Sequence, residues 1–177
     1  IITAAVLKLY PRPADVATVF CAVAGARGAT AMLSRLRGAT GDGVTTFEYL
    51  NRACLDLVLE HIDATRDPFQ ARHGDYALIE LSSGREVAEA ALAGAIEAGE
   101  ALDAVIAESG RQADELWCLR ETIPEAQKRA GGSIKHDISV PVSKIPEFLE
   151  AAEEKSLQII PGARLVTFGH IGDGNIH

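Results

Sequence analysis

The 177-residue sequence has little of several residue types, and each shortage excludes a class of protein. Its three cysteines, Cys21, Cys54 and Cys118, are widely spaced and form no CxxC pair. This usage argues against a disulfide framework and favours a reducing compartment, with the cysteines as small buried side chains. No apolar run approaches the roughly 20 residues that span a bilayer, and no signal peptide is visible.

Positive charge is also scarce. The 17 Lys and Arg residues against 25 Asp and Glu residues give a formal net charge of -8. An acidic surface argues against nucleic acid as a partner, although a local basic pocket for an anionic substrate remains compatible with it. The length and the 47% hydrophobic content suit one globular domain, or one domain with extra pieces.

Both ends of the sequence fall inside structured-looking segments. The chain begins without methionine in the apolar run 1–7 and stops at His177, directly after a glycine-rich turn. Domains rarely begin and end in this way, so we expect a piece of a longer protein. The prolines at 11 and 13 favour a domain seam, with residues 1–12 as a linker or the end of a preceding domain and 13–177 as the domain proper.

Apolar spacing and turn residues predict an alternation of strands and helices. The predicted strands are 1–10, 16–23, 45–50, 76–81, 133–142 and 165–168. The predicted helices are 28–36, 52–62 with Asn51 as its cap, 85–109, 112–129 and one that Ser143 caps. Short, uneven connections favour an α+β fold, a mostly antiparallel sheet with helices on one face, and two similar β-α-β units indicate ferredoxin-like repeats.

The most informative segment is residues 168–177, Phe-Gly-His-Ile-Gly-Asp-Gly-Asn-Ile-His. Its three glycines and its Asp-Gly step predict a tight turn flanked by His170 and His177. If the chain folds back, both imidazoles can reach one divalent metal ion, but a third ligand must come from elsewhere. The alternative is a turn whose histidines only form local hydrogen bonds, and the residues alone leave both interpretations open.

Three charged residues are further candidates for a binding site. Arg120, in a predicted helix, can bind a carboxylate through its planar guanidinium, although an arginine paired with a nearby glutamate on the surface is commoner. Lys135, in the predicted strand 133–142, can offer a point charge to an anion or belong to a solvated face. Glu48 lies in an apolar run, and we interpret it as an outward-facing strand residue rather than a buried site residue.

These segments together resemble the C-terminal domain of FAD-linked oxidases, the group of D-lactate dehydrogenases, the glycolate oxidase flavin subunit and D-2-hydroxyglutarate dehydrogenases. The resemblance lies in Gly-His-Ile-Gly-Asp-Gly-Asn-Ile-His, in Leu-Arg-Glu at 119–121, and in Lys-His-Asp-Ile-Ser-Val-Pro at 135–141, in family order. It covers essentially the whole chain. Residues 1–12 are similar to the end of the family's flavin-binding domain, which would place Ile2 and Thr3 near the cofactor.

The resemblance implies an enzyme that oxidises a D-2-hydroxyacid of the D-lactate, glycolate or D-2-hydroxyglutarate type and passes hydride to FAD. A preceding domain would bind most of the FAD, and residues 13–177 would form the substrate- and metal-binding cap. Arg120 and Lys135 would then bind the small anionic substrate, and His170 and His177 would bind a divalent metal, with zinc as the first candidate.

The resemblance also implies what lies outside this sequence. The family's acidic third metal ligand and its histidine base would follow His177, so we expect no catalytic residue within the chain and no activity of the chain alone. Members of the D-2-hydroxyglutarate branch tend to carry threonine four residues after the arginine, where Pro124 stands here.

Other expectations concern partners and location. We expect an electron acceptor other than nicotinamide, a homodimer as an option, and a cytoplasmic location with peripheral association at the inner membrane as an alternative. The competing hypothesis is a free-standing α+β module that binds a small anion or a protein without catalysis.

Overall fold

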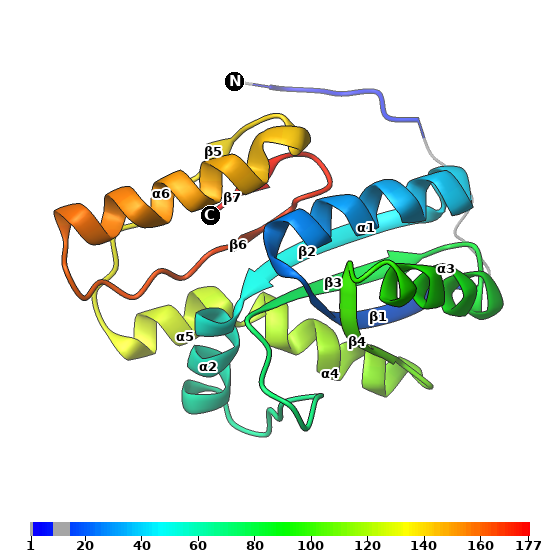
Figure 1. Ribbon diagram of the computed structural model, residues 1–177, viewed down its shortest axis with the longest axis horizontal. Coiled ribbons are helices and arrows are strands. Elements are labelled where there is room, and N and C mark those ends of the chain that lie inside the picture. The colour runs from blue at the N-terminus through cyan, green and yellow to red at the C-terminus, as the bar shows by residue number, and fades with distance from the viewer. Residues whose placement is uncertain (1, 9–14) are drawn as a thin grey trace.

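The computed structural model describes residues 2–8 and 15–177, which form a five-stranded antiparallel sheet, a two-stranded sheet and six α-helices (Figure 1). The strands are β1 Ala17–Val23, β2 Val44–Asn51, β3 Asp75–Leu81, β4 Ala101–Ile106, β5 Ile138–Ser139, β6 Phe168–Gly169 and β7 Asn175–Ile176. The α-helices are α1 Gly25–Thr40, α2 Arg52–His61, α3 Arg85–Glu97, α4 Gly110–Glu121, α5 Ile123–Ala130 and α6 Ile145–Ile159.

The larger sheet has the order β4-β1-β3-β2-β6, and every neighbouring pair in it is antiparallel. The predicted α+β class and antiparallel sheet are therefore confirmed. The units β1-α1-β2 and β3-α3-β4 interleave, since β3 lies between β1 and β2. They are the two halves of one ferredoxin-like arrangement, to which β6 adds an edge strand beside β2.

Helices cover both faces of this sheet, and the expectation that they lie on one face is wrong. Val19 and Cys21 of β1 belong to the core cluster formed with α1 and α3, whereas Phe20 and Ala22 belong to the cluster formed with α2, α4 and α5. Figure 1 shows α1 above the sheet and the α2, α4 and α5 group below it. A strand that is apolar on both sides needs a cover on each side, as in this molecule.

The largest error in the predicted elements is the single long helix over 85–109. The helix α3 ends at Glu97, Gly99 has a φ of +70°, and the chain then returns as β4 to pair with β1. Glycine reaches this left-handed conformation without steric penalty, so it permits the reversal. Local helix preference in the segment after Gly99 is overridden by strand pairing, which the periodicity could not show.

Other segments differ in length. The predicted helix over 112–129 is divided into α4 and α5, with Pro124 in the first turn of α5, where proline is tolerated. The predicted strands 133–142 and 165–168 shorten to the two-residue strands β5 and β6. Residues 2–8 form no strand, and the remainder of the predicted strand 1–10 lies outside the described residues.

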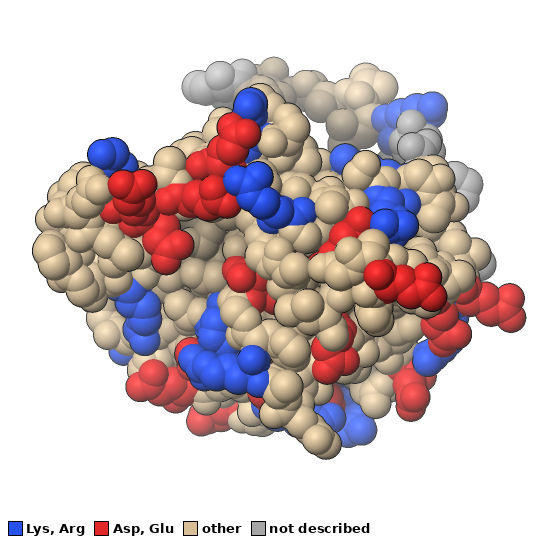
Figure 2. Space-filling model, viewed as in Figure 1, with Lys and Arg blue, Asp and Glu red and all other residues tan. Residues whose placement is uncertain are grey.

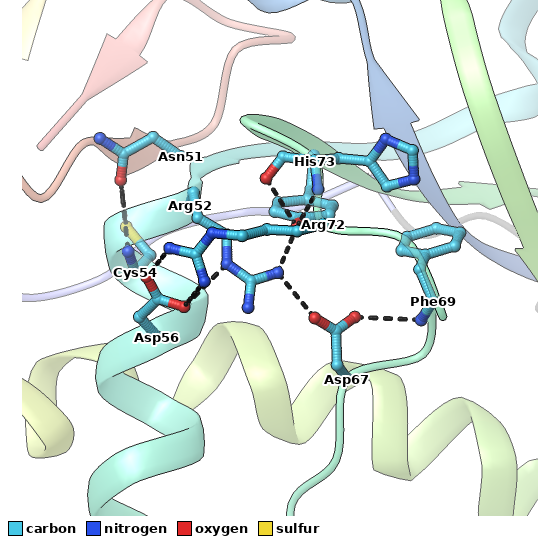
Figure 3. A network of polar contacts seen from close by, with 9 residues as sticks. Asn51, Arg52, Cys54, Asp56, Asp67, Phe69, Arg72 and His73 are labelled. Atoms are coloured by element: carbon cyan, nitrogen blue, oxygen red, sulfur yellow. Dashed lines mark hydrogen bonds and ion pairs between the residues drawn. The ribbon is translucent and has the colours of Figure 1, made fainter.

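The N-terminus of α2 is held by a polar network (Figure 3). The Asn51 side chain accepts a hydrogen bond from the Cys54 amide, as predicted for a helix cap, and donates one to the Leu165 carbonyl. Arg52 and Arg72 both bind Asp56, and these hydrogen bonds lower the pKa of that carboxyl although burial opposes the shift.

Two findings bear on the expectations from composition. The three cysteines are free thiols, and Cys21 and Cys54 are buried. Within the described residues, no helix combines the length and the apolar character needed to cross a membrane.

Candidate functional site

The candidate site lies where β2 and β6 pair at the edge of the large sheet. Tyr49 is opposite Gly169 and Leu50 is opposite Phe168, so the register places Glu48 opposite His170. Side chains alternate along a strand, and Glu48 and His170 therefore share one face of the sheet with Phe168. Antiparallel pairing thus brings together two residues that are 122 positions apart in the sequence.

Glu48 is the centre of a buried charge cluster. The residue is 2% exposed, and Arg120 of α4 beside it is 7% exposed. The Oε2 atom of Glu48 accepts a hydrogen bond from Nε of Arg120 at 2.9 Å and lies 2.8 Å from Nη2 in the same ion pair, while Oε1 contacts Nδ1 of His170. Each buried charge has an opposite partner, which is the condition for holding ions in the interior of a protein.

An aromatic ring completes the surroundings of Arg120. The guanidinium carbon of Arg120 lies 4.8 Å from the centroid of the Phe168 ring, within the range of a cation–π interaction. The Phe168 ring is in turn 5.2 Å from the His177 ring. Arg120, Phe168 and His177 therefore form a continuous series of contacts from the protein interior to the glycine-rich turn.

The predicted turn within 168–177 is confirmed. The amides of Asp173 and Asn175 both donate to the His170 carbonyl, at 3.1 and 3.2 Å, and the His177 amide donates to the Phe168 carbonyl at 2.7 Å. From outside, Arg37 of α1 donates through Nη2 to the Gly172 carbonyl at 2.8 Å. The chain reverses over these residues, so that the two imidazoles lie with ring centroids 6.4 Å apart and interplanar angle 75°.

The two histidines are oriented in a similar way. Nδ1 of His170 contacts Glu48, and Nδ1 of His177 lies 3.8 Å from Oδ1 of Asp137, so each imidazole turns this nitrogen toward a carboxylate. The Nε2 atoms hydrogen-bond no described residue and remain available as ligands. Metal-binding histidines commonly have this carboxylate behind the ring. The described part of the chain gathers no set of three His, Cys, Asp or Glu side chains around one point, so the pair could supply two ligands of a larger site.

Arg120, Lys135, His170 and His177 all line one cleft, whose volume is about 1710 Å³. Its walls come from β2, α4, α5, α6, the segment 132–138 and the chain around β6 and β7. Lys135 is exposed in this segment, just before β5, and forms no ion pair with a described residue. The structure thus places all four candidates at one cleft, with Arg120 buried in its wall and Lys135 at its surface.

Charge in the cleft differs from charge over the protein as a whole. Acidic side chains gather on the exposed face of α6 (Figure 2), where Glu147, Glu150 and Glu154 are exposed. The cleft, in contrast, is lined by equal numbers of basic and acidic side chains, which are Arg37, Arg120, Lys135, Arg164, Glu48, Glu121, Asp137 and Asp173. An anion therefore meets less repulsion in the cleft than over the surface of α6.

Glu48 is the site residue that the sequence interpretation missed, and its assignment as an outward-facing residue is wrong. Its neighbours Phe47 and Tyr49 pack on one face of β2, and Leu50 packs on the other, so this part of β2 is buried on both faces. Apolar residues on both faces of the strand were the available signal. Ile2, by contrast, is 89% exposed, and neither it nor Thr3 lines the cleft.

The fold and the cleft define an α+β domain that carries two histidines and a buried arginine at one edge of its sheet. Residues 12–177 match the family described as FAD linked oxidases, C-terminal domain, and the chain therefore belongs to this family. The resemblance drawn from the three sequence segments is confirmed.

Three relatives illustrate the match. The mitochondrial D-2-hydroxyglutarate dehydrogenase of Arabidopsis thaliana is 32% identical over 182 residues, which span 100% of this chain and 32% of the relative. The mitochondrial D-2-hydroxyglutarate dehydrogenase of Rattus norvegicus is 32% identical over 186 residues, spanning 100% of this chain and 33% of the relative. The D-2-hydroxyglutarate dehydrogenase of Xanthomonas citri pv. viticola is 39% identical over 135 residues, which span 74% of this chain and 28% of the relative. The chain thus spans about a third of the length of these relatives.

Proposed function

We propose that this chain is the substrate-binding domain of an FAD-dependent dehydrogenase that oxidises a D-2-hydroxyacid to the 2-oxoacid, with hydride transfer to FAD. The observation that carries the proposal is the convergence of Arg120, Lys135, His170 and His177 on one cleft. Because the chain spans about a third of its relatives, most of the FAD site is proposed to lie elsewhere in a longer protein.

Substrate binding is proposed to use two unlike cations. Lys135 is exposed at the cleft and offers a point charge to the carboxylate of the substrate. Arg120 already donates from Nε to Glu48 and pairs with the same carboxylate through Nη2, which leaves Nη1 for the substrate. This division differs from a free guanidinium fork, since Arg120 would orient the carboxylate with one donor while Lys135 supplies most of the attraction.

A divalent metal, with zinc as the first candidate, is proposed to bind Nε2 of His170 and Nε2 of His177. The donor set fits this role because a carboxylate lies behind each ring, but a third ligand must come from outside the described residues. A metal bound there would lower the pKa of the substrate hydroxyl. The base that removes the hydroxyl proton is likewise proposed to lie outside this chain, which alone would be inactive.

D-2-hydroxyglutarate is the first substrate to test, because the relatives are named for it. Arg164 also lines the cleft without an ion pair to a described residue, and it offers a second positive charge to a dicarboxylate. Pro124, which stands where threonine is typical of that branch, lines the cleft as well, so lactate and glycolate stay in the comparison.

The remaining expectations stay proposals of the same kind. They are an electron acceptor other than nicotinamide, a homodimer as one option for assembly, and a cytoplasmic location with peripheral association at the inner membrane as the alternative.

The test is reduction of the flavin in the full-length protein by a panel of D- and L-2-hydroxyacids, followed as loss of flavin absorbance. We expect one D-2-hydroxyacid to bleach the flavin, and we expect Lys135→Ala to raise the substrate concentration required. Lys155→Ala is the matched control, because Lys155 is an exposed lysine of α6 that does not line the cleft. His170→Ala should slow the bleaching, whereas His61→Ala, outside the cleft, should not.

Two outcomes would contradict the proposal. A bound flavin that no 2-hydroxyacid reduces would restrict the relationship to the fold and direct the search to other alcohols or amines. A full-length protein without flavin would favour the alternative of a binding module without catalysis.

A further inference from the structure

We propose that Glu48 is a positioning residue of this site, which sets the orientation of both Arg120 and His170 through one buried carboxylate. The inference rests on the proposed function, because it concerns how the substrate- and metal-binding groups are held. It adds a residue on β2 that the family motifs in the sequence did not indicate.

The two oxygens of the Glu48 carboxylate have different partners. Oε2 accepts a hydrogen bond from Nε of Arg120 at 2.9 Å and forms an ion pair with Nη2 at 2.8 Å, and Oε1 contacts the imidazole of His170. The partners lie on α4 and at the end of β6, whereas β2 itself pairs with β3 on one side and with β6 on the other. Glu48 therefore lies on a strand that is paired on both sides, and its carboxylate contacts side chains from two other parts of the chain.

Exposure separates this arrangement from an ordinary buried ion pair. Glu48 and Arg120 are both buried, but the side chain of His170 is 55% exposed and lines the cleft. A carboxylate whose only role was to neutralise Arg120 would not need a contact with a solvent-exposed imidazole as well. Glu48, which lies on a strand of the sheet, thus restricts the orientation of the His170 imidazole at the surface of the cleft.

The contact also determines which nitrogen of His170 faces the cleft as an acceptor. A carboxylate that is ionised only accepts hydrogen bonds, and in a neutral imidazole an Nδ1 that donates to it leaves the lone pair on Nε2. Nε2 is the atom that the proposed function assigns to the metal. Glu48 therefore selects the tautomer that can bind a metal.

A glutamine at position 48 would reverse this selection. Arginine has donors and no acceptor, so the amide oxygen of glutamine must face Arg120 and its NH2 group must face His170. That NH2 group would donate to Nδ1, and the imidazole proton would move to Nε2. The substitution keeps the shape of the side chain while placing a proton on the proposed metal-binding nitrogen.

The experiment compares Glu48→Gln with Glu80→Gln in the full-length protein. Glu80 is a matched control on the adjacent strand β3, because its Oε1 accepts a hydrogen bond from Trp117 at 2.8 Å and it contacts neither Arg120 nor His170. Zinc is removed from each protein and titrated back by calorimetry, and KM and kcat for the reducing substrate are measured on the same samples. Flavin content and thermal unfolding report whether each variant is folded.

We expect Glu48→Gln to weaken zinc binding by roughly 10- to 100-fold and to raise KM, with flavin content retained. Glu80→Gln should leave both values unchanged. A purely structural role for Glu48 predicts a lower unfolding temperature with unchanged zinc affinity and KM of the folded protein, and that result would overturn the inference.

Glu48→Asp serves if Glu48→Gln does not fold, because aspartate keeps the charge beside Arg120 but is one methylene too short to hold both partners. Unchanged zinc affinity and KM in Glu48→Asp would then refute the inference. An unsubstituted protein that binds no zinc would instead refute the metal site of the proposed function. In that case the Glu48 inference is decided by KM alone, and an unchanged KM rejects it.

Discussion

Substitution of Gly174 by alanine tests how the glycine-rich turn positions His177. Gly174 has a φ of +88°, and a Cβ atom built on it would lie 2.0 Å from the carbonyl oxygen of Val140. The same two residues are joined by a hydrogen bond, from the Val140 amide to the Gly174 carbonyl at 3.0 Å. Alanine therefore requires both a strained backbone and a separation of β5 from the turn.

The expected loss of local stability in Gly174→Ala follows from these two effects. The left-handed conformation destabilises a residue with a side chain by roughly 1–2 kcal/mol. Moving Val140 away to relieve this overlap also removes the hydrogen bond from its amide to the Gly174 carbonyl, which contributes about 1 kcal/mol. A local destabilisation of about 2–3 kcal/mol corresponds to a roughly 30- to 150-fold larger equilibrium constant for opening of this segment.

Hydrogen exchange followed by mass spectrometry on the full-length protein measures this opening directly. Peptides that cover β5 and β7 should exchange faster in Gly174→Ala, while peptides from β1 should not change. Gly172→Ala is the matched control in the same turn, because its Cβ would meet nothing closer than 3.6 Å. Equal protection of β5 and β7 in the two variants would refute the proposed steric role of Gly174.

Two further predictions concern titration and thiol chemistry. Burial raises the pKa of Asp75 above its usual value of 3.8, although the hydrogen bond from Tyr49 opposes the shift. The protonated carboxyl therefore stabilises the folded protein at a pH below 3.8, and this contribution is lost as pH rises through the pKa of the folded state. Asp75→Asn keeps an acceptor for Tyr49 and should flatten this loss in urea unfolding across acidic pH; an unchanged slope would contradict the assignment. Burial raises the pKa of the Cys54 thiol to about 12, so a disulfide reagent at neutral pH should modify the partly exposed Cys118 and spare Cys54 until unfolding, and equal rates would count against this.

The sequence by itself determined the elements whose signals are local. The apolar pattern around β1 and β3, the Asn51 cap of α2 and the glycine-rich turn before His177 all depend on residues close in the chain, and the structure confirms them. The family segments likewise led to the correct relationship, since the match covers 12–177. Local backbone preference and short motifs are readable from sequence because neighbours along the chain decide them.

Tertiary structure alone decided β4, the helices on the second face of the sheet, and the role of Glu48. The segment after Gly99 becomes a strand because β1 offers an edge to pair with, a contact between positions about 85 residues apart. Glu48 becomes buried because β6 covers the free edge of β2 and because Arg120 arrives from α4 to balance its charge. Such outcomes depend on which distant segments meet, and the free energy of burying a charge is set by those partners rather than by its neighbours in the chain.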